Sequence, residues 1–431
     1  MQTEKLYEIY KKYPLVSTDT REIKSGSIFF ALKGSNFNGN EFADKALNMG
    51  AKYVVIDQKE YVKDSRYILV DNVLNALQDL ALFHRNQLVI PVVGVTGTNG
   101  KTTSKELLFS VLSQKFKTFA TKGNLNNHIG VPLSLLSINS SYQVAIIEMG
   151  ANHVGEIKFL SQIAKPTHGL ITNVGKAHLE GFGSFEGVKK AKGELYDFLA
   201  DNNGKLFLQG DNEDLVEMAG GRKFSKIIKY GFSSFNDIIG ELLIANPYLS
   251  ISWKLKQSLQ NYKISTHLTG SYNTENFLAA IAVGIEFGVN SQLINKGLSA
   301  YVPQNNRSQI TKTLKNTIVA DFYNANVSSM TAALDNMRVL SVDKKIVILG
   351  DMFELGNESY KEHAYVIQKA KSLELERLIF VGKEFYKHKD DKLEFYETTQ
   401  QAAEALKAIN GGFILLKASR GMLFEKLLEV L

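Results

Sequence analysis

The chain has no cysteine among its 431 residues. This absence excludes disulfide bridges, thiolate zinc sites and a cysteine nucleophile. No apolar run approaches the length of a membrane span, and the first residues lack the basic-then-apolar order of a signal peptide. Long polar low-complexity tracts and solenoid repeats are missing too. We therefore expect a soluble cytoplasmic protein in which every domain can bury a core.

The chain also lacks a concentration of charge of one sign. The formal net charge is +6 and the sequence pI is about 9.0, but the basic excess is spread along the chain. Nucleic-acid-binding proteins more often show a dense basic stripe with interleaved aromatic residues. We expect small anionic ligands, no nucleic-acid partner, no membrane insertion and a monomer.

What the sequence does contain is a glycine-rich stretch between a predicted strand and a predicted helix. The β-branched apolar residues 88–93 predict a buried parallel strand, and apolar residues at helical spacing predict a helix over 104–112. Glycines at such a turn let backbone N–H groups converge on phosphate oxygens, where the helix dipole favours anions. The stretch reads Gly94-Val95-Thr96-Gly97-Thr98-Asn99-Gly100-Lys101-Thr102-Thr103.

Two side chains of this stretch have the chemical groups needed to bind a nucleoside triphosphate and its Mg²⁺. Lys101 can neutralise β- and γ-phosphate charge, and the Thr102 hydroxyl can bind Mg²⁺. The generic phosphate-loop pattern has a glycine six residues before the lysine, where this chain has Val95, with Gly94 one step earlier. The alternative is an ordinary glycine-rich turn with a solvated lysine, and the flanking strand and helix favour the phosphate loop.

Further polar residues follow predicted strands of the same region. Glu148 comes directly after a strand over 143–147, and His178 lies after a strand over 168–172. Lys192 lies on a lysine-rich helix predicted over 185–199. Taken singly, His178 reads as a polar loop residue and Lys192 as part of a solvated helix face. Together with a phosphate loop they give the groups that a Mg²⁺-bound triphosphate needs at the carboxyl edge of a sheet.

The alternation of predicted strands and helices indicates an α/β protein of three domains. Residues 1–89 predict a small α/β domain, and residues 90–304 predict a central, doubly wound, mostly parallel sheet. Residues 305–431 predict a second doubly wound, Rossmann-like domain. Strand-like segments with partial alternation predict an antiparallel extension of the central sheet; they cover 227–230, 241–245, 249–255 and 262–268.

Motifs of the central region follow one another in an order that resembles a known family. They are Gly97-Thr98-Asn99-Gly100-Lys101-Thr102-Thr103, Asn124-Leu125-Asn126-Asn127-His128-Ile129-Gly130-Val131-Pro132, Glu148-Met149-Gly150, Thr172-Asn173-Val174, His178-Leu179-Glu180 and Ala191-Lys192-Gly193-Glu194. This order is similar to the central domain of the Mur ligases, which build the peptidoglycan stem peptide. Motifs of the third region resemble the D-alanyl-D-alanine-adding branch; they are Tyr323-Asn324-Ala325-Asn326, Gly350-Asp351-Met352-Phe353-Glu354-Leu355-Gly356 and Lys417-Ala418-Ser419-Arg420-Gly421-Met422.

The resemblance implies an ATP-dependent peptide ligase of peptidoglycan synthesis, and hence of cell shape and division. ATP would phosphorylate the terminal carboxylate of a UDP-N-acetylmuramoyl-tripeptide, and the amine of D-alanyl-D-alanine would attack the acyl phosphate. The cofactor implied is Mg²⁺, as two ions. The identity of the third stem residue stays open.

The resemblance also implies roles for individual residues. Lys101, His178 and Lys192 would be catalytic, with Thr102 and Glu148 holding one Mg²⁺, and His178 and a carbamylated Lys192 holding a second. Neighbouring Mg²⁺, Lys189 and Lys190 would lower the pKa of Lys192 enough for it to take up CO₂. Other implied positions contact ATP, namely Gly97, Thr98, Asn99, Gly100, Thr103, Asn276, Arg307, Asp321 and Tyr323. Substrate-binding positions are Asp19, Thr20, Arg21, Asn126 and Asn127.

Several interpretations remain open at this point. Taken alone, residues 17–21 more often form a turn, and Asn273 and Asn276 at a predicted helix start are usually caps. Asn38-Gly39-Asn40 and Ser271-Tyr272 depart from the family pattern, which leaves their nucleotide contacts open. A folylpolyglutamate-type ligase, another Mur-type ligase or an ATP-driven switch are the alternative functions. Because ATP contacts come from two domains, we also expect closure around a linker near Arg307.

Overall fold

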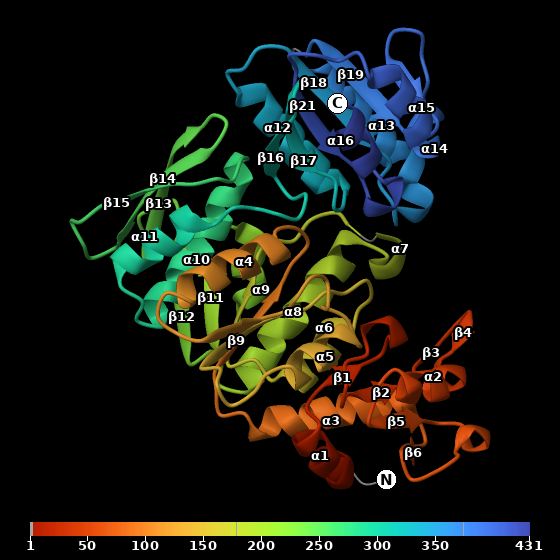
Figure 1. Cartoon of the computed structure of the whole chain (residues 1–431). Coiled ribbons are helices and arrows are strands. Elements are labelled where there is room, and N and C mark those ends of the chain that lie inside the picture. Colours follow the sequence, from red (N-terminus) through yellow and green to blue (C-terminus); the bar gives the residue numbers. More distant parts are fainter. Residues whose placement is uncertain (1–2, 178, 374) are drawn as a thin grey trace.

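The computed structural model describes residues 3–177, 179–373 and 375–431. Its strands form sheets of four, nine and six strands, with one further two-stranded hairpin. These sheets follow one another along the molecule, from the red N-terminal part to the blue C-terminal part (Figure 1). The predicted three-domain α/β architecture is confirmed. The predicted domain boundaries, between residues 89 and 90 and between residues 304 and 305, stay predictions. They fall after α3 (Val73–Gln87) and after α11 (Ser291–Ala300).

The N-terminal sheet is parallel and has the order β1-β2-β5-β6. Its buried strands are short and apolar, and α2 is followed by Gly50 with a φ of 105°, a conformation that suits glycine at a helix end. The elements are α1 (Thr3–Lys12), β1 (Val16–Ser17), β2 (Ile28–Phe30), β3 (Lys33–Gly34), β4 (Phe37–Asn38), α2 (Ala43–Asn48), β5 (Tyr53–Ile56), β6 (Tyr67–Leu69) and α3.

The nine-stranded central sheet has the order β15-β14-β13-β12-β11-β10-β7-β9-β8. The chain leaves β7 towards β8 and β9 on one side and then continues to β10 on the other. Its first elements are β7 (Val92–Thr96), α4 (Lys101–Leu112), β8 (Thr118–Ala120), α5 (Gly130–Leu136), β9 (Val144–Glu148), α6 (Glu156–Ala164) and β10 (His168–Ile171). Ligands bind at such a reversal of strand order, beyond the carboxyl ends of the strands.

The rest of this region completes the sheet and covers it. Its elements are α7 (Leu179–Phe182), α8 (Phe185–Asp201), β11 (Lys205–Gln209), α9 (Glu213–Ala219), β12 (Lys226–Gly231), β13 (Ile238–Ala245), β14 (Leu249–Leu255), β15 (Tyr262–Ser265), α10 (Thr274–Glu286) and α11. The strands β13, β14 and β15 pair antiparallel. The prediction was wrong for its first segment, because β12 pairs parallel with β11 and β13.

A second correction concerns the strand expected over 88–93. Pairing begins only at Val92, and Val89 is 98% exposed. Pro91 has no backbone N–H to donate, so it is poorly suited to the interior of a ladder. The strand therefore starts four residues later than expected and runs on to Thr96, at the edge of the glycine-rich stretch.

The six-stranded sheet of the third region has the order β16-β17-β21-β18-β19-β20. Its edge strand β16 runs antiparallel to its neighbour, and the other pairs are parallel. The elements are β16 (Gln309–Lys312), β17 (Thr317–Asp321), α12 (Val327–Val339), β18 (Lys345–Gly350), α13 (Ser359–Lys371), β19 (Arg377–Val381), α14 (Lys383–Tyr386), β20 (Glu394–Tyr396), α15 (Thr399–Leu406), β21 (Phe413–Lys417) and α16 (Glu425–Val430). Apolar clusters cover both faces of this sheet.

The joint between the N-terminal and central sheets is largely apolar. One continuous cluster of buried side chains includes Leu77 of α3 and Leu135 of α5. Polar contacts fix it further, since the Tyr10 hydroxyl donates to the Leu136 carbonyl at 2.6 Å and the Arg85 guanidinium donates to the Ala164 carbonyl at 2.8 Å. These two parts of the chain therefore pack as one body.

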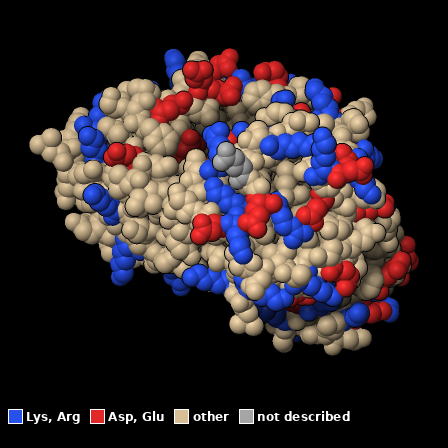
Figure 2. Space-filling model, turned by 90° about the horizontal axis from the view of Figure 1, so that it is seen from above, with Lys and Arg blue, Asp and Glu red and all other residues tan. Residues whose placement is uncertain are grey.

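The surface agrees with the charge pattern of the sequence. On the face shown in Figure 2, basic and acidic side chains are interspersed rather than gathered into a stripe. Within the described ranges, the structure has no helix that is both long and apolar enough to cross a membrane.

Candidate active site

The glycine-rich stretch forms a loop between β7 and α4. Gly97 and Gly100 have φ values of 143° and 77°, which favour glycine. A Cβ on Gly97 would lie 2.0 Å from Thr172 Oγ1. Gly100 is the N-cap of α4 and supplies no side-chain cap, so the helix presents its first N–H groups to a ligand. Val95, the departure from the generic pattern, is a buried residue of β7.

The end of β10 supports this loop from the neighbouring strand. Thr172 Oγ1 donates to the Asn99 carbonyl at 2.6 Å, and the Asn99 N–H donates to Asn173 Oδ1 at 3.0 Å. Thr172 and Asn173 belong to a motif of the family resemblance, but no role in the site was predicted for them. Their position at the carboxyl end of a predicted strand is the signal that could have identified them.

Lys101 is bonded within the loop. Its Nζ donates to the carbonyls of Gly97 and Thr98 at 2.7 and 2.9 Å. Burial lowers its pKa to about 8; nearby Glu148 opposes this shift and Arg307 adds to it. The alternative of a merely solvated lysine is therefore wrong.

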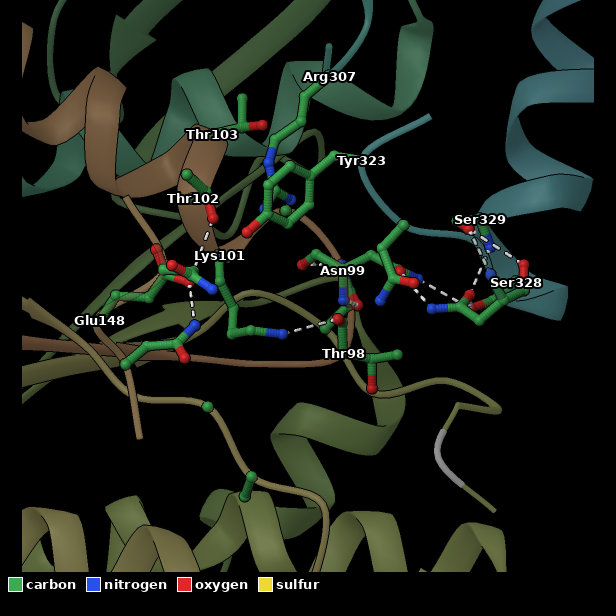
Figure 3. A pocket seen from close by; sticks show the side chains of 18 of the residues that line it. Thr98, Asn99, Lys101, Thr102, Thr103, Glu148, Arg307, Tyr323, Ser328 and Ser329 are labelled. Atoms are coloured by element: carbon green, nitrogen blue, oxygen red, sulfur yellow. Dashed lines mark hydrogen bonds between the residues drawn. The ribbon is translucent and has the colours of Figure 1, made fainter. Parts of the chain in front are cut away.

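Glu148 ends β9 with a side chain that is 1% exposed. Its Oε1 accepts hydrogen bonds from Thr102 Oγ1 at 3.2 Å and Asn126 Nδ2 at 2.8 Å (Figure 3). Its Oε2 is buried and has no hydrogen-bond partner among the residues that the structure describes. A buried carboxylate oxygen without a donor is costly unless a cation lies near it. A hydroxyl beside a carboxylate is an oxygen pair that suits Mg²⁺.

The described part of the chain contains no group of three or more His, Cys, Asp or Glu side chains that could hold a metal ion. A divalent cation next to Glu148 would have the Thr102 hydroxyl beside it as a second protein oxygen. His178, the predicted ligand of a second ion, lies outside the described residues.

Lys192 is buried on α8, with 2% of its side chain exposed, so the reading of a solvated helix face is wrong. Its Nζ donates to the Ala151 carbonyl at 3.3 Å and lies 5.2 Å from the centre of the Phe182 ring. Burial lowers its pKa well below the usual value, and the positive charge of Lys101 lowers it further; Glu156 and Glu194 oppose the shift.

The predicted influence of Lys189 and Lys190 on Lys192 is not what the structure shows. Neither contributes to the lowered pKa of Lys192. The Lys189 ammonium instead lies 2.6 Å from Asp214 and 3.1 Å from Glu217 of α9. These two carboxylates pair with the Lys189 ammonium and offset its charge. The effective neighbour is Lys101, which is distant in sequence.

The third domain faces the loop with a cation and an aromatic ring. The Arg307 guanidinium stacks on Tyr323, with its central carbon 3.8 Å from the ring centre. Arg307 Nε is buried and finds no hydrogen-bond partner in the described part of the chain. Asp321 forms an ion pair with Lys417 at 2.7 Å, across two paired strands. Figure 3 shows Arg307 and Tyr323 beside Thr102 and Thr103.

Asn276 of α10 lies directly beneath the loop. Its Oδ1 accepts from Ser104 Oγ at 2.9 Å, and its Nδ2 donates to Asn273 Oδ1 at 2.9 Å. Asn273 occupies the predicted N-cap position of α10, but its side chain makes no cap bond, and Asn276 lies inside the helix. The Asn273 amide donates to the Thr269 carbonyl at 2.7 Å instead. Both side chains fix the floor of the site.

Asn99 connects the loop to the third domain. Its Nδ2 donates to Ser328 Oγ at 2.8 Å, and its Oδ1 accepts from Asn326 Nδ2 at 2.8 Å (Figure 3). Asn326 is the N-cap of α12 and forms a capping box with Ser329. This contact was not predicted from the sequence, because no local pattern relates Asn99 to residues so distant along the chain.

A cavity of about 840 Å³ lies between the central and third domains, with the loop at its centre. The predicted residues that line it are Thr98, Asn99, Gly100, Lys101, Thr102, Thr103, Asn126, Asn127, Glu148, Asn276, Arg307, Asp321 and Tyr323. Its lining also includes further residues of the segments 124–128 and 150–160, of α10 and of the third domain. Gly97 and Lys192 lie behind this lining.

The predicted nucleotide-recognition residues of the N-terminal domain are not part of this cavity. Asp19 is the N-cap of a short 3-10 turn and accepts from the Arg21 N–H at 2.9 Å. Its carboxylate also pairs with the exposed Arg21 guanidinium, and this lowers the Asp19 pKa to about 2. Thr20 begins the same turn.

Taken together, the loop, its position at the reversal of strand order and the facing third domain define a nucleotide-using α/β enzyme. Three family models match the chain in order: "Mur ligase family, catalytic domain" over residues 12–94, "Mur ligase middle domain" over 95–284 and "Mur ligase, glutamate ligase domain" over 306–420. The chain belongs to the Mur ligase family.

Similar proteins cover almost the whole chain. The UDP-N-acetylmuramoyl-tripeptide–D-alanyl-D-alanine ligase of Bacillus subtilis is 35% identical over 96% of this chain and 92% of that protein. The Escherichia coli enzyme of the same name is 33% identical over 96% and 93%. The crystal structure of MurF from Thermotoga maritima in complex with ADP has a TM-score of 0.85 at 26% identity and covers 96% of both chains. That of MurF from Acinetobacter baumannii also has a TM-score of 0.85, at 29% identity over 96% of this chain and 92% of that one.

Replacing Asn99 by alanine removes both of its hydrogen bonds to the third domain. Each net bond contributes about 1 kcal/mol, so we expect the free protein to become less compact in solution. Small-angle scattering measures this as a larger radius of gyration. Asn324→Ala is the matched control, because the Asn324 Oδ1 accepts from the neighbouring Ala325 N–H within the third domain. Equal compactness of Asn99→Ala and the control would contradict the role of this contact.

The lowered pKa of Lys101 predicts a pH dependence of nucleotide binding. Above a pH of about 8 the free lysine is neutral, and a bound phosphate favours its protonated form. ADP affinity measured in EDTA should fall as the pH rises from about 7 to about 9, and binding should take up a proton. Calorimetry in buffers of different ionisation enthalpy measures both effects. In Lys101→Met the proton uptake should vanish, and its persistence there would assign it to another group.

Proposed function

We propose that this chain uses ATP to join D-alanyl-D-alanine to a UDP-N-acetylmuramoyl-tripeptide. The similar ligases of this name span nearly the whole chain. The observation that carries the proposal is the cavity, where the phosphate loop, the buried Glu148 and the third domain meet. Its lining combines residues of the segments 124–128 and 150–160 with residues of α10 and the third domain. A nucleotide and a second anionic substrate would therefore both reach the loop within one cavity.

In the proposed reaction, a carboxylate oxygen of the tripeptide attacks the γ-phosphorus of ATP, and ADP leaves. The amine of the dipeptide then attacks the acyl carbon of the acyl phosphate, loses a proton and displaces inorganic phosphate. Transfer between two anions chiefly needs charge neutralisation and alignment. The N–H groups at the start of α4 and the Lys101 ammonium supply the positive field, and Arg307 faces it from the third domain.

The metal assignment forms part of this proposal. Thr102 and Glu148 would hold one Mg²⁺, supported by the unpartnered Glu148 Oε2. His178 and a carbamylated Lys192 would hold a second. Support for the carbamate is the burial of Lys192 and its lowered pKa, because only a neutral amine takes up CO₂. When bound, these ions would neutralise phosphate charge and polarise the γ-phosphate.

The remaining assignments are also part of the proposal. The nucleoside of ATP would lie beside Asn276, Arg307, Asp321 and Tyr323, and the tripeptide beside Asn126 and Asn127, all of which line the cavity. Asn127 Oδ1 accepts from the N–H groups of Ile129 and Gly130, which leaves its amide nitrogen for a ligand. Asp19, Thr20 and Arg21 would contact the uridine nucleotide. A monomer in the cytoplasm completes the proposal.

A phosphate-release assay with purified protein tests the function. We expect release that requires ATP, Mg²⁺, D-alanyl-D-alanine and a UDP-N-acetylmuramoyl-tripeptide together. Tripeptides with lysine or diaminopimelate as the third residue would define the substrate preference. Release without the dipeptide or the tripeptide would indicate an ATP-driven switch instead, and release with a folate and glutamate would indicate a folylpolyglutamate-type ligase.

Lys192→Ala tests the proposed carbamate. We expect phosphate release to fall by about 10²-fold or more, since charge stabilisation at the transferred group is lost. A short-chain carboxylic acid should restore part of the activity by replacing the carbamate. Lys190→Ala, on the same helix, is the control and should keep the activity. Full activity of Lys192→Ala without added acid would rule out the carbamate.

A further inference from the structure

Lys105 is a buried cation for which the proposed reaction gives no role. It lies one helical turn after Lys101 on α4, and only 1% of its side chain is exposed. Its Nζ donates to the Thr121 carbonyl at 2.7 Å and lies 2.9 Å from Glu106 Oε1. Burying an ammonium costs free energy that its partners must offset. An apolar side chain of the same length would avoid this cost.

The Thr121 carbonyl is the first fixed point of a loop over residues 122–129. This loop connects β8 to α5, and Asn124, Asn126, Asn127 and His128 bring it into the cavity lining. No regular secondary structure holds it in place, so its position depends on individual contacts from the elements around it.

Besides α5, whose Ser134 Oγ donates to the Leu125 carbonyl at 3.5 Å, three other elements hold this loop. From α4, Lys105 binds its start at Thr121. From the end of β9, the Gly150 N–H donates to the Asn126 carbonyl at 2.7 Å, and Glu148 accepts from the Asn126 amide. From α3, Gln78 Nε2 donates to the His128 carbonyl at 3.0 Å. Of these anchors, only Lys105 is a cation, and hydrogen bonds from charged donors are stronger than neutral ones.

Thr121 also connects Lys105 to the proposed metal ligand. While its carbonyl accepts from Lys105, its Oγ1 accepts from the Glu148 N–H at 3.0 Å. The same residue thus fixes the start of the loop and the backbone of Glu148. A shift of Thr121 would move Asn126 and Glu148 together.

We propose that Lys105 is a positioning residue for the muramoyl-peptide substrate. It fixes Thr121 and thereby the loop of residues 122–129, which would present Asn126 and Asn127 to the carboxylate that is activated. This inference rests on the proposed function. It adds a residue that touches none of the three substrates and acts through the backbone carbonyl of Thr121.

Lys115 offers a matched control. It follows the opposite end of α4, and its Nζ likewise donates to backbone carbonyls, those of Phe287 at 3.3 Å and Gly288 at 2.8 Å. It does not line the cavity. Lys115→Met therefore removes the same kind of contact, a lysine bonded to backbone carbonyls, without touching the loop of residues 122–129.

The experiment is a calorimetric titration of UDP-N-acetylmuramoyl-tripeptide into protein saturated with a non-hydrolysable ATP analogue. For Lys105→Met we expect binding about tenfold weaker or more, as the loss of one charge-assisted hydrogen bond implies. The affinity for ADP in EDTA should change by less than about twofold, since the loop of residues 97–100 keeps its contacts. Hydrogen exchange should rise in peptides that cover residues 122–129. Lys115→Met should match the wild type in all three measurements.

Each other outcome has a distinct meaning. Wild-type protein that does not bind the tripeptide would overturn the proposed function itself. Unchanged tripeptide binding in Lys105→Met would overturn the positioning role, and equal losses for tripeptide and ADP would make Lys105 a general structural residue. If Lys105→Met does not fold, Lys105→Gln, which keeps an N–H donor but loses the charge, carries the same expectations.

Discussion

The rest of the site depends on the hydrogen bonds that the Glu148 carboxylate accepts. Glu148 ends a fully buried strand and accepts hydrogen bonds from Thr102 of the phosphate loop and from Asn126 of the loop over residues 122–129. Because both donors converge on one oxygen, the other is left buried without a partner among the described residues. The free energy cost of that oxygen falls when a cation binds beside it. Without a ligand, this buried oxygen therefore destabilises the folded protein. Binding of a cation beside it offsets that free energy cost.

The same reasoning accounts for the buried lysines of the central domain. Burial lowers the proton affinity of both Lys101 and Lys192, and the charge of Lys101 lowers that of Lys192 further. A phosphate at the loop would attract the proton of Lys101 and hold it there. For Lys192, burial and the charge of Lys101 both favour the neutral form of the amine.

Local sequence patterns were sufficient for the framework of the site. A buried strand followed by Glu148, and a strand followed by glycines and Lys101, place their polar residues at one edge of a parallel sheet whatever the rest of the chain does. Such patterns could not predict which side chains bond to one another. Lys189 is one helical turn from Lys192, but its charge is taken up by α9, which sequence spacing does not place. Asn273 has the residue type of a cap and uses its amide elsewhere.

The start of one strand and the contacts between distant residues could not be predicted either, for related reasons. An apolar run predicts burial but does not say where pairing begins, so the strand that starts at Val92 was placed four residues too early. The contact of Asn99 with Ser328 joins residues far apart in sequence, and neither has a local pattern that names the other.

The two joints of the molecule differ in kind, and this difference determines where motion is expected. The N-terminal and central domains share an apolar cluster, and separating them would expose it to water at a high free energy cost. The third domain has its own cores and meets the loop through polar contacts, which exchange for water at little net cost. Closure is therefore expected at the second joint, beside Arg307. Since Asn99 belongs both to the phosphate loop and to that joint, phosphate binding and domain closure act on the same residue.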